Sequence, residues 1–119
     1  MLQCFARGSR EAELYAAIAK RLRAAVGEIS VKHDRTQTAF VRHVQFAWVS
    51  MPRRRADAGA VMLSFGLPSP VESGRILHRA QVDPGRWMHH MLIRDEGEMD
   101  DEVLGWLTAA WAFVGPGRR

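Results

Sequence analysis

The sequence predicts an α+β fold: an antiparallel meander of about five to six strands, with an N-terminal and a C-terminal helix packed on one face. Helical periodicity occupies both ends of the chain. Between them lie short runs rich in β-branched and aromatic residues, separated by turn residues. Strands joined by short turns pair in antiparallel order, and two terminal helices can cover one face of such a sheet.

The first helix is predicted to begin after Ser9, whose side chain suits the N-cap position. Acidic residues follow in the first turn and basic residues occupy the far end, as the helix dipole favours. Gly27 is the expected stop. The apolar residues recur at helical spacing: Leu14, Ala17, Ile18, Leu22 and Val26.

Six strands are predicted after this helix, at residues 28–32, 36–42, 45–51, 60–67, 75–81 and 87–93. Pro52 ends the third strand, because proline cannot donate a hydrogen bond to the ladder. Residues 53–59 are predicted to form an exposed hairpin turn. The last strand is predicted to be central in the sheet, since it contains little that is polar apart from two histidines.

The second helix is predicted to begin after Asp100, which can cap it, and to end at Gly115. These elements define three parts of the chain: a flexible N-terminal arm at 1–8, a single α+β domain at 9–115 and a C-terminal tail at 116–119. A chain of 119 residues suffices for one domain with a proper core.

Composition restricts the classes of function. The 17 Lys and Arg residues exceed the 13 Asp and Glu residues and give a net charge of +4, which favours anionic partners, nucleic acid being one candidate. Arginine richness is also typical of a GC-rich genome. No apolar run is long enough for a membrane span and no secretory signal is recognisable, so we expect a cytoplasmic protein. Cys4 is the only cysteine, which excludes an intramolecular disulfide.

Three segments of the chain are similar to a known family. They are Arg35-Thr36 to Pro52-Arg53, then Arg75-Ile76-Leu77, then Arg86-Trp87-Met88-His89-His90-Met91-Leu92-Ile93 with Asp100 to Ala110. The chain resembles, over about 9–114, a family of small bacterial domains of unknown function, some of which are labelled predicted transport proteins. The resemblance implies an α+β domain and no established activity, so it supplies no catalytic residue.

His89 and His90 are neighbours on the last predicted strand, so their side chains point to opposite faces and cannot bind one metal ion together. We predict that His89 is a hydrogen-bonded core histidine and that His90 lies on the uncovered face. His78 on the preceding strand can approach one of them across the ladder. No spacing typical of metal ligands supplies a third ligand, so no metal or other cofactor is expected.

The arginines are the strongest remaining indication of a binding site. Arg53, Arg54 and Arg55 cluster at the predicted hairpin tip, and arginine offers forked donors that match phosphate or carboxylate. A solvated hairpin tip explains the same cluster without any function. The candidate residues for binding an anion or another ligand are Arg42, Trp48, Arg53, Arg54, Arg55, His78, Arg86, His90 and Arg94.

Three hypotheses follow, with binding preferred to catalysis. The first is a non-catalytic module that binds a ligand or partner through a basic surface. The second is an enzyme that uses His90 or His78 as an acid–base group on a small or nucleic-acid substrate, although Ser64 lies in no Gly-x-Ser-x-Gly elbow. The third is an accessory domain that acts through a homodimer, because apolar residues such as Met62 and Leu92 are predicted on the uncovered sheet face.

Overall fold

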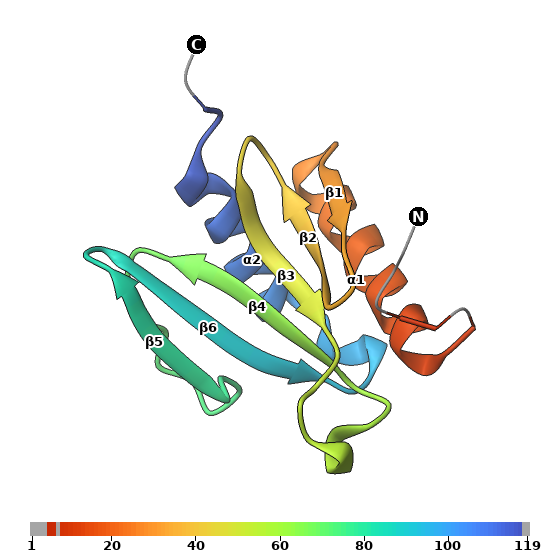
Figure 1. Ribbon diagram of the computed structural model, residues 1–119. Helices are drawn as coiled ribbons and strands as arrows, with labels where there is room; N and C mark the ends of the chain where they lie inside the picture. The colour runs from red at the N-terminus through yellow and green to blue at the C-terminus, as the bar shows by residue number, and fades with distance from the viewer. Residues whose placement is uncertain (1–4, 7, 118–119) are drawn as a thin grey trace.

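The computed structural model describes residues 5–6 and 8–117. It contains one six-stranded antiparallel sheet with helices α1 and α2 on one face (Figure 1). Cys4, most of the predicted arm and residues 118–119 of the predicted tail lie outside the described residues. Phe5, in the segment predicted as the arm, is buried and stacks on Tyr15 of α1 at 5.7 Å between ring centroids.

Both helices begin and end where the sequence predicts. Helix α1 spans Arg10–Val26, and the Ser9 side chain accepts a hydrogen bond from the Ala12 N–H. Helix α2 spans Asp101–Val114, and the Asp100 carboxylate accepts one from the Val103 N–H. Gly27 and Gly115 follow the helices at φ of +90° and +69°, a region that glycine enters without strain. Neither helix could serve as a membrane span, being too short or too polar, and no other described helix qualifies.

The strands confirm the predicted fold class. Their bounds are β1 Ser30–His33, β2 Gln37–Val41, β3 Gln45–Ser50, β4 Val61–Leu67, β5 His78–Asp83 and β6 Arg86–Ile93. Two short 3₁₀ helices accompany them, η1 Arg55–Asp57 after β3 and η2 Glu96–Glu98 after β6. Every neighbouring pair of strands is antiparallel.

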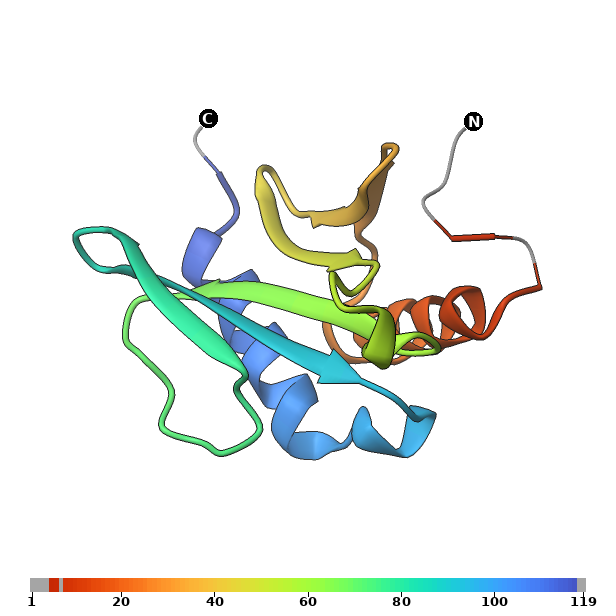
Figure 2. The ribbon, with the colours of Figure 1, turned by 60° about the horizontal axis from the view of Figure 1, so that its bottom comes forward.

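The strand order is β1-β2-β3-β4-β6-β5, which departs from a simple meander after β4. The long connection at 68–77 carries the chain past the position of β6, so β5 forms at the edge and a tight turn at Gly85 returns the chain inward (Figure 2). Burial explains this order. Strand β6 has alternate buried residues and needs neighbours on both sides, whereas β5 is mostly exposed and suits an edge.

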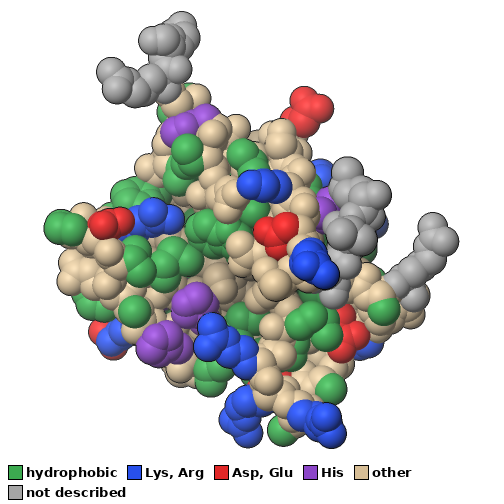
Figure 3. Space-filling view, viewed as in Figure 1, with side chains coloured by type: hydrophobic (Ala, Val, Ile, Leu, Met, Phe, Trp, Pro, Cys, Tyr) green, Lys and Arg blue, Asp and Glu red, His purple; other side chains and the backbone are tan. Residues whose placement is uncertain are grey.

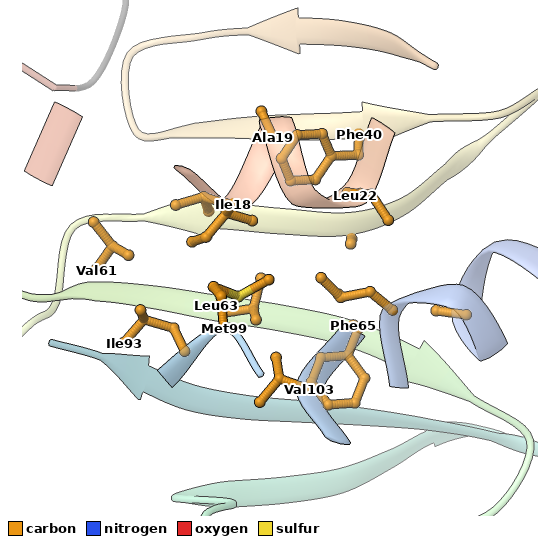
Figure 4. Close-up of a cluster of buried hydrophobic side chains, with 14 of the residues drawn as sticks. Ile18, Ala19, Leu22, Phe40, Val61, Leu63, Phe65, Ile93, Met99 and Val103 are labelled. Atoms are coloured by element: carbon orange, nitrogen blue, oxygen red, sulfur yellow. The ribbon is translucent and has the colours of Figure 1, made fainter. Parts of the chain in front are cut away.

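The core lies between the sheet and the helices (Figure 4). Directly opposite residues of antiparallel strands share a face, so the register places Leu63 opposite Met91 and Val61 opposite Ile93 on the helix-covered side. The two helices complete this core with residues that include Leu14, Ile18, Leu22, Val103 and Leu107, all of them fully buried.

His89 confirms the prediction of a core histidine. Its side chain is fully buried and its ring stacks on Phe65 at 5.1 Å between centroids. His89 Nε2 accepts a hydrogen bond from the Val71 N–H at 2.9 Å, so the proton of the neutral ring is on Nδ1. No hydrogen-bond partner for Nδ1 is found within the described part of the chain. His89 therefore fastens the connection at 68–77 to the sheet.

Candidate functional site

One row of side chains crosses four strands on the uncovered face of the sheet. Trp48 on β3 is opposite Ser64 on β4, Ser64 is opposite His90 on β6, and His90 is opposite His78 on β5. Since opposite residues share a face, the four side chains lie on the side away from the helices. His90 is thus on the uncovered face, as predicted.

A groove of about 510 Å³ opens over Ser64, His90 and His78 of this row. Figure 3 shows histidine side chains next to cationic and hydrophobic ones on this face. The hydrogen bond from the Leu77 N–H to the His90 carbonyl, at 2.8 Å, positions the start of β5 at the groove. The residues that line the groove are Gln37, Ser50, Met51, Arg53, Met62, Ser64, Leu77, His78 and His90.

Ser64 and His90 form the tightest polar contact in the groove. Ser64 Oγ lies 2.7 Å from His90 Nδ1, and the direction of this hydrogen bond depends on the tautomer of the ring. Burial, followed by the charges of His78, His89 and Arg53, lowers the pKa of His90 below its ordinary value. The lowered pKa favours the neutral imidazole of His90 at neutral pH.

His78 and His90 face each other across the β5–β6 ladder. Their ring centroids are 5.9 Å apart and the two rings are tilted by only 16°. Arg53, from the β3–β4 connection, lines the same groove. None of the residues that line the groove is acidic, so its charged and titratable groups are all basic.

Several predicted arginines are engaged elsewhere. The Arg42 guanidinium lies 3.6 Å from the centroid of the Trp111 ring and donates to the Trp111 carbonyl at 3.0 Å, which caps the last turn of α2. Arg94 pairs with the Asp57 carboxylate at 2.8 Å, and Arg54 approaches the same carboxylate at 4.0 Å. These arginines have structural partners and lie outside the groove lining.

The other predicted residues also lie outside the groove. Arg55 is exposed on η1. Trp48 is on the uncovered face, but its indole N–H donates to the Gln45 side chain at 2.8 Å. Arg86 reaches over Gly66, where a Cβ atom would lie 3.5 Å from its Nε. Of the nine predicted site residues, the groove brings together Arg53, His78 and His90.

The groove also contains residues that are not among the predicted site residues: Gln37, Ser50, Met51, Met62, Ser64 and Leu77. Ser64 lies in no nucleophile elbow, so no local motif points to it. The signal that finds it is the strand register, because a serine opposite a histidine on a shared face places a hydroxyl beside an imidazole. That register follows from the pairing of β4 with β6, which lie far apart in the sequence.

A second hollow of about 570 Å³ lies along the connection at 68–77 and the start of β5. Its arginine, Arg79, is paired with Glu72 at 3.0 Å and donates to the Val71 carbonyl. An anion would have to displace an existing ion pair there. Among residues 5–6 and 8–117, no three His, Cys, Asp or Glu side chains converge to hold a metal ion. The groove on the uncovered face is therefore the candidate site.

Comparison with known proteins identifies the family. A family model described as "Domain of unknown function (DUF5655)" matches residues 6–114. The chain belongs to this family. No curated protein and no solved structure matches it. Membership of the DUF5655 family agrees with the resemblance found in the sequence and assigns no activity. A function for this DUF5655 domain is therefore inferred from the geometry of the groove.

Proposed function

We propose that this protein binds a small anionic ligand in the groove on the uncovered sheet face. The observation that carries the proposal is the convergence of Arg53, His78 and His90 on one groove whose lining contains no acidic residue. Basic groups that face one another without counter-ions repel, and an anion bound among them relieves that repulsion.

Arg53 is the principal anchor in this proposal. Within the described residues, no salt bridge or hydrogen bond of its guanidinium is found, whereas Arg54 and Arg94 share Asp57. A guanidinium offers paired N–H donors in a planar fork that matches an oxyanion. Arg53 is thus the groove arginine whose donors are available to a ligand.

The lining also supports a ligand with an apolar part. Met51 and Leu77 are 42% and 59% exposed, and both line the groove together with Met62, so the lining has an apolar part. A volume of about 510 Å³ is within the usual range for small-molecule sites. An aromatic or aliphatic body with one anionic group would use both halves of the groove.

Isothermal titration calorimetry with benzoate, phenyl sulfate and phenyl phosphate tests the proposal. We expect at least one of these aryl anions to bind, with an affinity that falls as salt is added. Arg53→Ala should weaken binding about tenfold, the loss of one charge-assisted contact. Arg55→Ala is the matched control, since Arg55 belongs to the same connection but lies outside the groove lining.

Two results would overturn this proposal. One is that none of the three anions binds to the parent protein. The other is that Arg55→Ala weakens binding as much as Arg53→Ala, which would mean diffuse attraction by the hairpin charges. Added salt weakens the attraction of an anion to either arginine. The comparison of Arg53→Ala with Arg55→Ala therefore decides whether Arg53 binds the ligand specifically.

A second candidate function is hydrolysis of an ester, and the 2.7 Å contact between Ser64 and His90 favours it. In such a step Ser64 Oγ attacks the ester carbonyl, His90 Nδ1 takes the hydroxyl proton and then returns it to the departing alkoxide. Water repeats the sequence and releases the acid. The candidate ranks second because Ser64 lies inside a central strand, where the backbone N–H groups serve the sheet rather than an oxyanion.

A fluorophosphonate probe tests the hydrolase candidate directly. Covalent labelling of Ser64, lost in Ser64→Ala and retained in Ser50→Ala, would support it. Labelling that is absent, or equal in both variants, would exclude Ser64 as a nucleophile.

The homodimer predicted from the sequence stays a prediction. Light scattering at several protein concentrations measures the oligomeric state.

A further inference from the structure

We infer that the groove selects a dianionic tetrahedral oxyanion of the phosphomonoester type and takes up a proton on the His78–His90 pair when this ligand binds. This inference rests on the proposed function, because it names the chemical class of anion for the same groove. Three features of the lining carry it: the paired imidazoles, the absence of a carboxylate and the number of hydrogen-bond donors.

The paired imidazoles are the first feature. His78 and His90 stand opposite each other, and their nearly parallel rings are 5.9 Å apart between centroids. At this separation the charge of His78 opposes a proton on His90, and so does the charge of Arg53. In the unliganded groove the neutral form of His90 is therefore favoured. A ligand with two negative charges offsets this repulsion far better than a ligand with one.

The groups that face His90 contain no negative charge. Strand β4 contributes the Ser64 hydroxyl, β5 contributes His78 and the β3–β4 connection contributes Arg53. His89, its neighbour along β6, points to the opposite face. His78 lines this groove and also the second hollow, where Glu72 is paired with Arg79 at 3.0 Å. The negative charge that would favour imidazolium at His90 must therefore come from the ligand.

The donors around the groove suit a tetrahedral oxyanion better than a carboxylate. The lining places the Arg53 guanidinium, the hydroxyls of Ser50 and Ser64, the Gln37 amide and two imidazoles around one volume. A carboxylate has two oxygens, while a phosphomonoester has three terminal oxygens that point in different directions. These donors come from five strands and a loop, and a group with three oxygens can accept from more of them than a group with two.

The titration range of the ligand supports proton uptake. The second ionisation of a phosphomonoester has a pKa of about 6, close to the ordinary range of histidine. When the dianion sits beside the two rings, an imidazole takes up a proton from the solvent, because imidazolium and dianion attract each other. We therefore expect binding to strengthen as the pH falls from 8 towards 6.5, where the ligand is still largely dianionic.

Three matched aryl anions test the inference by calorimetry: phenyl phosphate, phenyl sulfate and benzoate. Phenyl sulfate has the tetrahedral shape but only one negative charge, and benzoate has a planar carboxylate with one negative charge. At pH 7 we expect phenyl phosphate to bind about tenfold tighter than either of the others. Titrations in buffers of different ionisation enthalpy should report uptake of a fraction of a proton for phenyl phosphate alone.

The histidine variants locate that proton. His78→Asn and His90→Asn keep a polar side chain but cannot titrate, so each should lower proton uptake and flatten the dependence of affinity on pH. His43→Asn is the control, because His43 contacts the Val114 carbonyl at the end of α2 and does not line the groove. Circular dichroism checks that each variant folds. If His90→Asn fails to fold, His78→Asn alone tests the inference, because His78 is exposed.

The possible outcomes separate the two proposals. Equal affinity for benzoate and phenyl phosphate, lost in Arg53→Ala, would support an anion site and overturn its selectivity for a dianion. A preference for phenyl phosphate without proton uptake, or with uptake unchanged in both histidine variants, would overturn the role of the imidazole pair. Failure of all three anions to bind would overturn both the inference and the proposed function.

Discussion

Ser64 on β4 and His90 on β6 stand directly opposite each other, and the Ser64 Oγ lies 2.7 Å from His90 Nδ1 on the uncovered face of the sheet. The two residues are 26 positions apart in the sequence. Their contact orients the imidazole towards the groove and supplies a partner for a half-buried polar atom. The pair forms the middle of the row that runs from Trp48 to His78.

Ser64→Ala should therefore lower the free energy of unfolding by about 1 kcal/mol, because it leaves His90 Nδ1 without its hydrogen bond. Urea denaturation followed by circular dichroism measures this change. Ser50→Ala is the control, since no hydrogen bond of the Ser50 hydroxyl is found within the described part of the chain. An equal loss of stability in both variants would contradict the prediction.

Arg42→Met should destabilise the fold by about 1–2 kcal/mol, because it removes a charged hydrogen bond to the Trp111 carbonyl and a cation–π contact with the same residue. Binding of phenyl phosphate should not change, since Arg42 does not line the groove. Arg53→Ala should show the reverse pattern of weaker binding with unchanged stability. Weaker binding of phenyl phosphate by a folded Arg42→Met variant would contradict the placement of Arg42 outside the binding site.

Asp57→Asn should destabilise the fold by about 1–3 kcal/mol, the range for losing a charged hydrogen bond at a mostly buried group. The Asp57 side chain is only 10% exposed and joins the β3–β4 connection to Arg94 at the end of β6. Thermal unfolding measures the loss. Asp101→Asn is the control, because Asp101 is fully exposed and lies 3.9 Å from Arg21, so its midpoint should move much less.

The stability of the protein should fall as the pH drops from 7 towards 5. Burial lowers the pKa of His89 and of His90 below the ordinary value of 6.5. In the unfolded chain both groups bind protons more readily, so their contribution to stability is complete above about pH 6.5 and is lost as the pH falls through the folded values. Chemical denaturation at pH 8, 7, 6 and 5 measures this.

His89→Gln should flatten this acid dependence, because glutamine retains an acceptor for the Val71 N–H but does not titrate. The exposed carboxylates of Asp34 and Asp100 do not interfere in this range. Hydrogen bonds lower the pKa of each below its ordinary value of 3.8, so their effects occur at still lower pH. A stability that is constant from pH 8 to pH 5 would contradict the prediction.

Local elements were predictable where a single stretch of chain carries its own signal. Both helices begin at the predicted caps, and His89 faces the core while His90 faces the groove, because alternation along a strand follows from backbone geometry. The fifth strand shows the limit. The sequence predicts it at 75–81, whereas it occupies His78–Asp83, because Arg75 forms ion pairs with Asp100 and Glu102 at the start of α2.

The binding site was less predictable than the fold. Clustering in the sequence favoured Arg53, Arg54 and Arg55 as a unit, yet Asp57 and Arg94 form an ion pair that holds Asp57 beside Arg54 and leaves Arg53 at the groove. The partner of an arginine depends on which strands and loops are in contact in the folded protein. The distribution of charges along the sequence does not determine those contacts.

Periodicity, caps and composition were sufficient to establish an α+β domain with a core face, an uncovered face and a basic charge, because these properties depend on local backbone geometry and on residue type. Strand order and register were determined only by the tertiary structure. The placement of β6 between β4 and β5 brings Ser64, His90 and His78 into one row, and this pairing results from the packing of segments that are distant in the sequence.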